Sequence, residues 1–356
     1  MHLEDGKVPE GYTGYTERKK YINLTGFVLL LVMIVAAISA GSVPIPVLQV
    51  LKVLFTGTAS RQVQIIVLNI RLPQVLAAVA AGTGLAVSGT AMQSILRNPL
   101  GSPFTLGISN AAAFGASLAV MLLGTGIMHS TGADAVSITN PYITTCSAFS
   151  ACIVAAGVIL LIARLGKASP EVMVLAGVSL ASLFSAGTML LQYFADDVQL
   201  AAMVFWTFGD LARASWREVL LISSVTFGVS VYFILNIWNY NAIDAGDETA
   251  GSLGVSVERK RLAGMLAASL VTATIISFVG VIGFAGLVAP HMARRLLGDD
   301  HRYLIPGSMI AGALLLLAAD TAARTVLSPR VIPVAIVTAF AGAPVFIWLL
   351  VRGYRK

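Results

Sequence analysis

The sequence predicts an all-α protein that crosses a membrane about ten times. Of its 356 residues, 57% belong to the hydrophobic set and only 11% are charged, whereas soluble domains carry about 25% charged residues. So little polar surface cannot keep a compact body in water. An ordinary cytosolic enzyme, a disordered chain and a nucleic-acid-binding protein are therefore excluded.

Ten apolar runs are bounded by charge, proline or polar clusters, and most approach the roughly 20 residues that a spanning helix needs. They lie at 22–40, 72–96, 104–124, 140–163, 172–194, 218–238, 261–281, 284–297, 304–322 and 332–351. The run 284–297 is short for a full crossing, so we expect the neighbouring segments to span the rest of the membrane. Stretches 45–56 and 198–209 are too short to cross, which predicts interfacial helices or partial entries.

The distribution of Lys and Arg in the short loops predicts the orientation. With the N-terminus inside, 16 of the 23 basic residues face the cytoplasm and 7 face outward, namely Lys52, Arg61, Arg71, Arg213, Arg217, Arg324 and Arg330. A ten-span chain with both ends in the cytoplasm meets this pattern. We expect a cytoplasmic tail over 1–20 and, because no linker divides the chain, one transmembrane domain over 21–353.

Small residues recur along the spans at helical spacing. Gly177, Ala181 and Ser185 repeat every four residues, and such stripes let helix backbones approach closely inside a membrane. A second interpretation is that parts of this helix line a wide path for a bulky solute. Its candidate lining residues are Ser182, Ser185 and Met189.

Ionisable groups are almost absent from the spans. Asp320 is the main exception, and Arg324 one turn later can neutralise it, which favours a structural pair over a proton relay. An ion-coupled carrier would need such groups at mid-membrane. The chain has no nucleophile–base constellation, no phosphate loop and no zinc-ligand spacing. We therefore expect no metal, no cofactor and no enzymatic activity in this chain, and an energy source outside it.

Two regions outside the spans suit contact with partner proteins. The loop 239–258 is predicted to form two short helices with a glycine break, with Asp247 as a cap and Gly254 at the end. Its acids stand beside apolar residues, which fits docking to a soluble partner; a solvated connector is the alternative. On the opposite face, exposed Arg71 and Arg324 could bind carboxylates of an external protein, with interfacial anchoring as the alternative.

Two parts of the chain are similar to each other. Arg71-Leu72 opens a span that leads to Pro99, and Arg261-Leu262 opens another that leads to Pro290. The first starts outside and the second inside, so a true repeat would be inverted. Chance similarity between two leucine-rich spans explains the pattern equally well.

Several ordered motifs between about residues 60 and 352 resemble one family. The sequence is similar to the FecCD/BtuC-type permeases of type II ABC importers, which move iron chelates, haem and cobalamin. The motifs are Arg71-Leu72-Pro73, Ser88-Gly89, Arg97-Asn98-Pro99-Leu100, Leu106-Gly107-Ile108-Ser109, Ser252-Leu253-Gly254-Val255, Gly283 to His291, Ala319-Asp320 with Ala323-Arg324, and Ile332-Pro333-Val334.

The resemblance implies a homodimer in the cytoplasmic membrane with the solute path on its axis. Two cytoplasmic ABC ATPase subunits, which bind ATP and magnesium, would dock below, and an extracytoplasmic solute-binding protein above. Iron–siderophore complexes lead as cargo, followed by cobalamin or haem. A secondary carrier or channel that acts without ATPase subunits is the alternative.

The resemblance also implies roles for particular residues. It makes 241–256 the coupling helices, with the contact residues Asp244, Asp247, Glu248, Ser252, Leu253 and Gly254. Arg71 and Arg324 match positions that present arginines to the binding protein, although Gln74 departs from a second arginine common in cobalamin-type members. Positions near the cytoplasmic gate are matched by Asn98, Leu100, Ser169 and Pro170.

Overall fold

The computed structural model describes residues 10–41, 43–124, 126–128, 136–138, 141–166 and 169–353. Residues 1–9 of the predicted tail, Lys167 and the last three residues lie outside these ranges. Each predicted apolar run contains a helix: α1 (Glu10–Ser39), α4 (Leu72–Ile95), α5 (Ile108–Leu122), α6 (Pro141–Leu165), α7 (Pro170–Phe194), α9 (Trp216–Leu235), α12 (Val257–Val279), α13 (Ala285–Leu297), α14 (His301–Thr325) and α15 (Val334–Gly353).

Shorter elements connect these helices. Both stretches predicted as interfacial helices or partial entries are helical, as α2 (Val47–Thr56) and α8 (Asp197–Thr207). The others are α3 (Arg61–Ile65), the π-helical turn η1 (Ile66–Arg71), the 3-10 turn η2 (Leu211–Arg213), α10 (Ile237–Asp244), α11 (Asp247–Ser252), and the antiparallel strands β1 (Gly126–Met128) and β2 (Val136–Ile138), with Gly126 opposite Ile138.

Two helix starts lie earlier than the polarity of the sequence indicates. α1 begins at Glu10 rather than near residue 22, because the charged residues before the apolar run are themselves good helix formers. The second span begins at Arg61 and continues through α3, η1 and α4 to Ile95, a length of 35 residues. A change from polar to apolar residues marks the edge of the membrane, and a helix can continue past it.

Seven helices in the described residues are long and apolar enough to cross a membrane. α13 has 13 residues, as its short apolar run predicts, but α5 has 15 and is shorter than predicted. Irregular segments precede both helices, and each ends in a residue with positive φ, Gly107 and Phe284. Gly107 packs against Ala181 in the middle of α7, and Gly286 lies against Leu85 in the middle of α4. Both helices therefore start about midway through the bundle.

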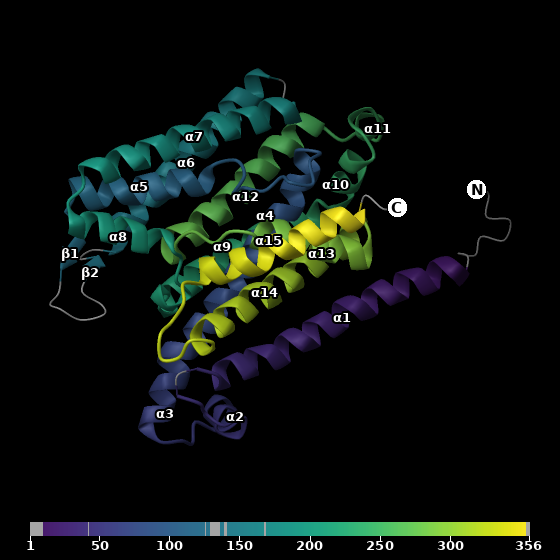
Figure 1. The fold of residues 1–356 in the computed structure, drawn as a ribbon. Coiled ribbons are helices and arrows are strands. Elements are labelled where there is room, and N and C mark those ends of the chain that lie inside the picture. The colour runs from purple at the N-terminus through teal and green to yellow at the C-terminus, as the bar shows by residue number, and fades with distance from the viewer. Residues whose placement is uncertain are drawn as a thin grey trace.

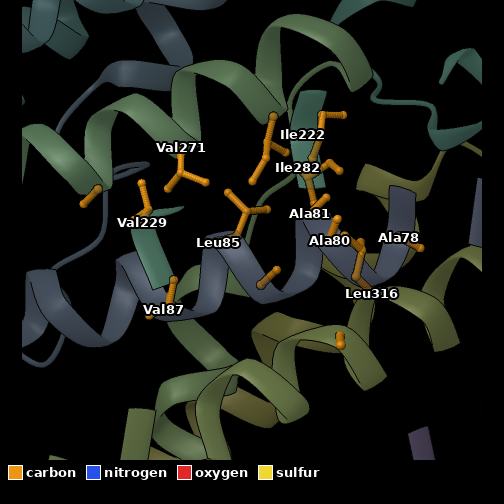
Figure 2. Close-up of a cluster of buried hydrophobic side chains, with 14 of the residues drawn as sticks. Ala78, Ala80, Ala81, Leu85, Val87, Ile222, Val229, Val271, Ile282 and Leu316 are labelled. Carbon is orange, nitrogen blue, oxygen red and sulfur yellow. The ribbon is translucent and has the colours of Figure 1, made fainter. Parts of the chain in front are cut away.

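The core is built around α4, which packs against α9, α12, α13 and α14. Figure 2 shows its small and branched side chains meeting Ile222 and Val229 of α9, Val271 of α12 and Leu316 of α14. A side chain at Gly82 would collide with the backbone of Gly312 in α14. Close backbone approach thus replaces the hydrophobic drive that membrane helices lack.

Contacts between the helices have the symmetry of the predicted inverted repeat. α4 packs on α14 as α12 packs on α6, and α5 packs on α6 as α13 packs on α14. The pairs α6–α7 and α5–α7 likewise correspond to α14–α15 and α13–α15. Exchanging α4–α7 with α12–α15 therefore maps each of these contacts onto another.

The ends of the bundle differ in what they carry. Figure 1 shows the start of α1, the end of α15, α10 and α11 at one end, and α2, α3, α8 and the strands at the other. We call the first the inner end, because the basic residues predict that it faces the cytoplasm. The second is the outer end.

Candidate coupling and docking sites

The predicted loop 239–258 folds into α10 and α11 at the inner end. Gly246, with φ 121°, separates the two helices, and Gly254, with φ 83°, follows the second. The Val255 N–H donates to Ala250 O at 2.9 Å and thereby closes the end of α11. Two short helices with a glycine break are therefore confirmed. Asp247 makes no side-chain capping bond, so the predicted cap is wrong.

Asp247 instead binds two arginines of the membrane body. Its carboxylate accepts bonds of 2.8 and 2.9 Å from the two terminal nitrogens of Arg261, near the inner start of α12. Arg97, which follows α4 in a left-handed conformation, donates to the same carboxylate at 2.5 Å. The Arg261 side chain is 4% exposed and that of Asp247 41%. This forked contact fixes α11 to both α4 and α12.

Asp244 holds α10 against the body at a second point. Its Oδ2 lies 2.9 Å from Nε2 of the fully buried His301 and 3.1 Å from Oγ of Ser94. Asn241 adds a bond of 3.1 Å to Oδ1 of Asp300, and the His301 N–H donates to Oδ1 of Asn241 at 2.9 Å. α10 is thereby joined to the inner ends of α4 and α14.

Asp300 is strongly ionised at this junction. Partial burial acts to raise its pKa, but hydrogen bonds from Arg302 and Asn241 outweigh burial and hold the pKa at about 2. The guanidinium of Arg302 contacts the carboxylate at 2.6 to 3.1 Å. The carboxylate therefore remains an acceptor for Asn241 at any physiological pH.

The six predicted contact residues separate into two groups. The side chains of Asp244 and Asp247 bond to the body while remaining partly exposed. The other four, Glu248, Ser252, Leu253 and Gly254, are exposed, and Leu253 is 68% exposed although it is apolar. The pair of helices therefore presents one residue group to the body and another to the surroundings of the inner end.

Arg71 and Arg324 lie at the outer end, but the predicted exposure is wrong. They are 5% and 8% exposed. Arg71 donates to the carbonyls of Ile38, at 2.8 Å, Ser39 and Val43; Arg324 reaches those of Ala37 and Ala40. The last carbonyls of a helix lack partners within it and carry partial negative charge, so the two guanidiniums cap the C-terminus of α1.

The predicted structural pair between Asp320 and Arg324 is confirmed. Arg324 Nε donates to Asp320 Oδ2 at 3.0 Å, and the amide Nε2 of Gln74 donates to Asp320 Oδ1 at 2.8 Å. Gln74, the position that departs from the family pattern, thus satisfies the second carboxylate oxygen. Both oxygens of the buried Asp320 carboxylate therefore have a partner.

The predicted gate residues occupy two separate turns. Leu100 is exposed, and its N–H donates to Asn98 Oδ1 at 2.9 Å, while the Pro99 carbonyl lies 2.7 Å from Nε2 of His291 in α13. Ser169 precedes Pro170, the first residue of α7. Both turns lie at the inner end of the bundle. The Asn98 side chain and carbonyl accept bonds from the N–H groups of Leu100 and Gly101, which stabilises the first turn.

The three candidate path residues of α7 face different surroundings. Ser185 Oγ accepts a bond of 2.7 Å from Asn110 of α5, and Ala181 packs against Gly107. The stripe of Gly177, Ala181 and Ser185 therefore serves helix packing. Ser182 and Met189 are exposed, on the side of α7 that this chain does not cover.

Sequence reasoning missed the anchors of α10 and α11. The sequence offers His301 no metal-ligand partner, and it indicates no role for Ser94 or Arg97. Their signal in the sequence is faint: Asp299-Asp300-His301 places charge directly before a span, and Arg97 follows another span. Among the described residues, no group of three or more His, Cys, Asp or Glu could hold a metal ion.

Comparison with known proteins agrees with this architecture. The family model of the FecCD transport family matches residues 29–352. A putative ABC transporter permease of Methanocaldococcus jannaschii is 48% identical over 98% of this chain and 99% of that protein. The hemin transport system permease protein HmuU of Yersinia pestis is 36% identical over 92% of this chain and 95% of its own length.

A solved structure supports the fold independently. It is titled an inward-facing conformation of a putative metal-chelate type ABC transporter, and it is 28% identical. Its TM-score to this chain is 0.81, with 94% of this chain and 99% of the other covered. On the family match, the relatives and the fold together, this chain belongs to the FecCD transport family.

Proposed function

We propose that this chain is the permease subunit of an ABC importer that carries a metal chelate across the cytoplasmic membrane, with both termini inside. The observation that carries the proposal is the two-faced pair α10–α11. Asp244 and Asp247 fasten it to the body, while Leu253 stands exposed beside Glu248. A short connecting segment that is fastened to a helical scaffold and leaves an apolar side chain uncovered suits a protein partner, here the cytoplasmic ATPase.

The contacts of α10 and α11 supply a route for force. When ATP binding closes the ATPase pair, a displacement of α11 passes through Asp247 to Arg261 in α12 and to Arg97 after α4. A displacement of α10 passes through Asp244 to His301 in α14. These helices form the core, so they move as packed bodies. The energy of the shift comes from the different affinities of ATP for the two states.

The spans offer no rival source of energy among the described residues. Arg324 balances the charge of Asp320 and Gln74 hydrogen-bonds its other oxygen, so Asp320 is a poor candidate for ion coupling. A secondary carrier, the alternative, lacks the mid-membrane group that it would need. The importer instead passes its cargo along a weakly binding path, for which we propose the exposed side of α7 at the axis of a homodimer.

An iron–siderophore complex is the proposed cargo, with haem or cobalamin next. Relatives of this chain are named as permeases for hemin, iron(3+)-hydroxamate and vitamin B12. Selectivity in such systems lies mainly in the external binding protein. Docking of that protein to Arg71 and Arg324, as the resemblance implies, would require both arginines to release the end of α1.

Co-purification with the ATPase subunits tests the proposal. The Leu253→Asp variant places a charge on the exposed surface, and Leu253→Met keeps its size and polarity as a matched control. We expect the first to lose the ATPase subunits or its stimulated hydrolysis and the second to keep both. Normal co-purification and hydrolysis with Leu253→Asp would remove α11 from this role.

A further inference from the structure

Helix α2 lies at the depth where the membrane meets water. The apolar part of α1 runs from Ile22 to Ser39, which at 1.5 Å per residue spans about 27 Å, close to the thickness of the hydrocarbon core. Ser39 therefore marks the outer boundary of the core. Two hydrogen bonds, from Ile45 N–H to Ser39 O and from Ser39 Oγ to Ile45 O, hold the start of α2 at this level.

The side chains of α2 fall into three sectors when residues are placed about 100° apart around the helix. One sector of about 100° packs on the body and contains Val50, Val53 and Leu54. A polar sector of about 60° contains Gln49, Lys52 and Thr56. The third, about 100° wide, is apolar and largely uncovered, with Val47, Leu48, Leu51 and Phe55.

This third sector, which we call the free apolar face, is exposed to an unusual degree. Phe55 is 83% exposed and Leu48 65%. The apolar side of α2 is thus about twice as wide as its contact with the body requires. An in-plane helix at a bilayer surface has this distribution, with one side in the acyl region and a narrow polar side toward water.

Exposed apolar side chains also line α1, the helix that α2 contacts. Figure 1 places α2 and α3 at the outer end of α1 and away from α5 to α8. α1 itself exposes Phe27, Leu31 and Val32 along its apolar run. At the same edge, the exposed cations Lys52 and Arg61 suit the phosphates of lipid headgroups.

We infer that α2 is an in-plane anchor in the outer leaflet: its free apolar face enters the acyl region, and Lys52 and Arg61 bind phospholipid phosphates. The apolar face makes this edge a membrane contact rather than a surface for the external binding protein. The anchor also holds the chain that leads through α3 and η1 to Arg71. α2 thus connects the lipid surface to the cap at the end of α1.

Spin labels in bilayer nanodiscs test the apolar part. Single cysteines replace Leu48 or Phe55 on the free apolar face and Gln49 or Thr56 on the polar sector, in a background with Cys146→Ser and Cys152→Ala. We expect labels at 48 and 55 to be accessible to oxygen and shielded from a water-soluble nickel chelate, and labels at 49 and 56 to show the reverse. Nickel access at 48 and 55 overturns the inference, as does exclusion of both reagents, which would reveal a protein partner or a second copy.

Native mass spectrometry tests the charged part. In nanodiscs that contain phosphatidylglycerol, the double variant Lys52→Gln with Arg61→Gln should retain fewer lipids than the unaltered protein. Arg217→Gln, which removes an exposed cation from the start of α9, is the control and should retain as many. Equal retention by the double variant and the control would refute phosphate binding at this edge.

Discussion

The contact between Asp247 and Arg261 gives the sharpest test of how α11 is seated. Asp247→Asn keeps the shape of the side chain but removes its charge, and the amide nitrogen of Asn cannot accept a bond from the guanidinium. One of the two bonds to Arg261, at 2.8 and 2.9 Å, is then lost. Arg261 is left buried with weakened pairing, and its Nε has no partner either.

The size of the effect follows from the burial of the pair. A hydrogen bond to a charged group contributes about 1.5–3 kcal/mol. Because the Asp247 side chain is 41% exposed, solvent screening places the loss near the lower end, about 2 kcal/mol. At about 1.4 kcal/mol per tenfold change, local opening of α11 should become about 30 times more frequent.

Hydrogen exchange of the backbone amides measures this opening directly. We expect amides of α11 and the adjoining turn to lose protection by about 30-fold in Asp247→Asn, while amides in the middle of α4 keep theirs. Glu248→Gln, an equal charge change on the exposed neighbour, is the control and should leave protection unchanged. Equal losses in the two variants, or none in either, would refute the assigned seat of α11.

Three further predictions concern packing and the outer end. Arg324→Glu sets a second carboxylate beside Asp320 and removes a cap of α1. It should lower the free energy of unfolding by about 3–5 kcal/mol and lower the melting temperature. Weakened docking of the binding protein at an unchanged melting temperature would contradict this explanation. Gly82→Ala should destabilise by about 1–3 kcal/mol through collision with α14, seen as a lower melting temperature. Gly157→Ala, where a Cβ meets open space, should be neutral or stabilising by up to about 1 kcal/mol; a loss equal to that of Gly82→Ala would refute the packing explanation.

The order and the positions of the apolar helices could be predicted because a backbone without water must bond to itself. Helix ends were less predictable. α1 extends to Glu10, since polar residues that favour helix carry it beyond the membrane. α5 begins only at Ile108, because the segment after Pro99 is irregular. The prolines and glycines of that segment indicate a break in the helix, but its apolar residues favoured an earlier start.

The docking residues show what spacing alone cannot provide. Arg71 and Arg324 were expected to be exposed because charge belongs in water. Their partners are carbonyls at the end of α1, about 30 and 285 residues away in sequence. Any residue type can supply an unpaired backbone carbonyl at a helix end, so the sequence does not indicate where these acceptors lie. The bonds of Asp247 could not be predicted either, since Arg97 and Arg261 lie about 150 and 14 residues away in the sequence.

The central claim is that this chain moves cargo only with energy from an ATPase partner. Uptake of a ferric siderophore complex into proteoliposomes measures it most directly. We predict uptake when the chain is combined with its ATPase subunits, its binding protein and ATP, and none when the chain alone is given a proton or sodium gradient. Uptake by the chain alone along an ion gradient would contradict the account.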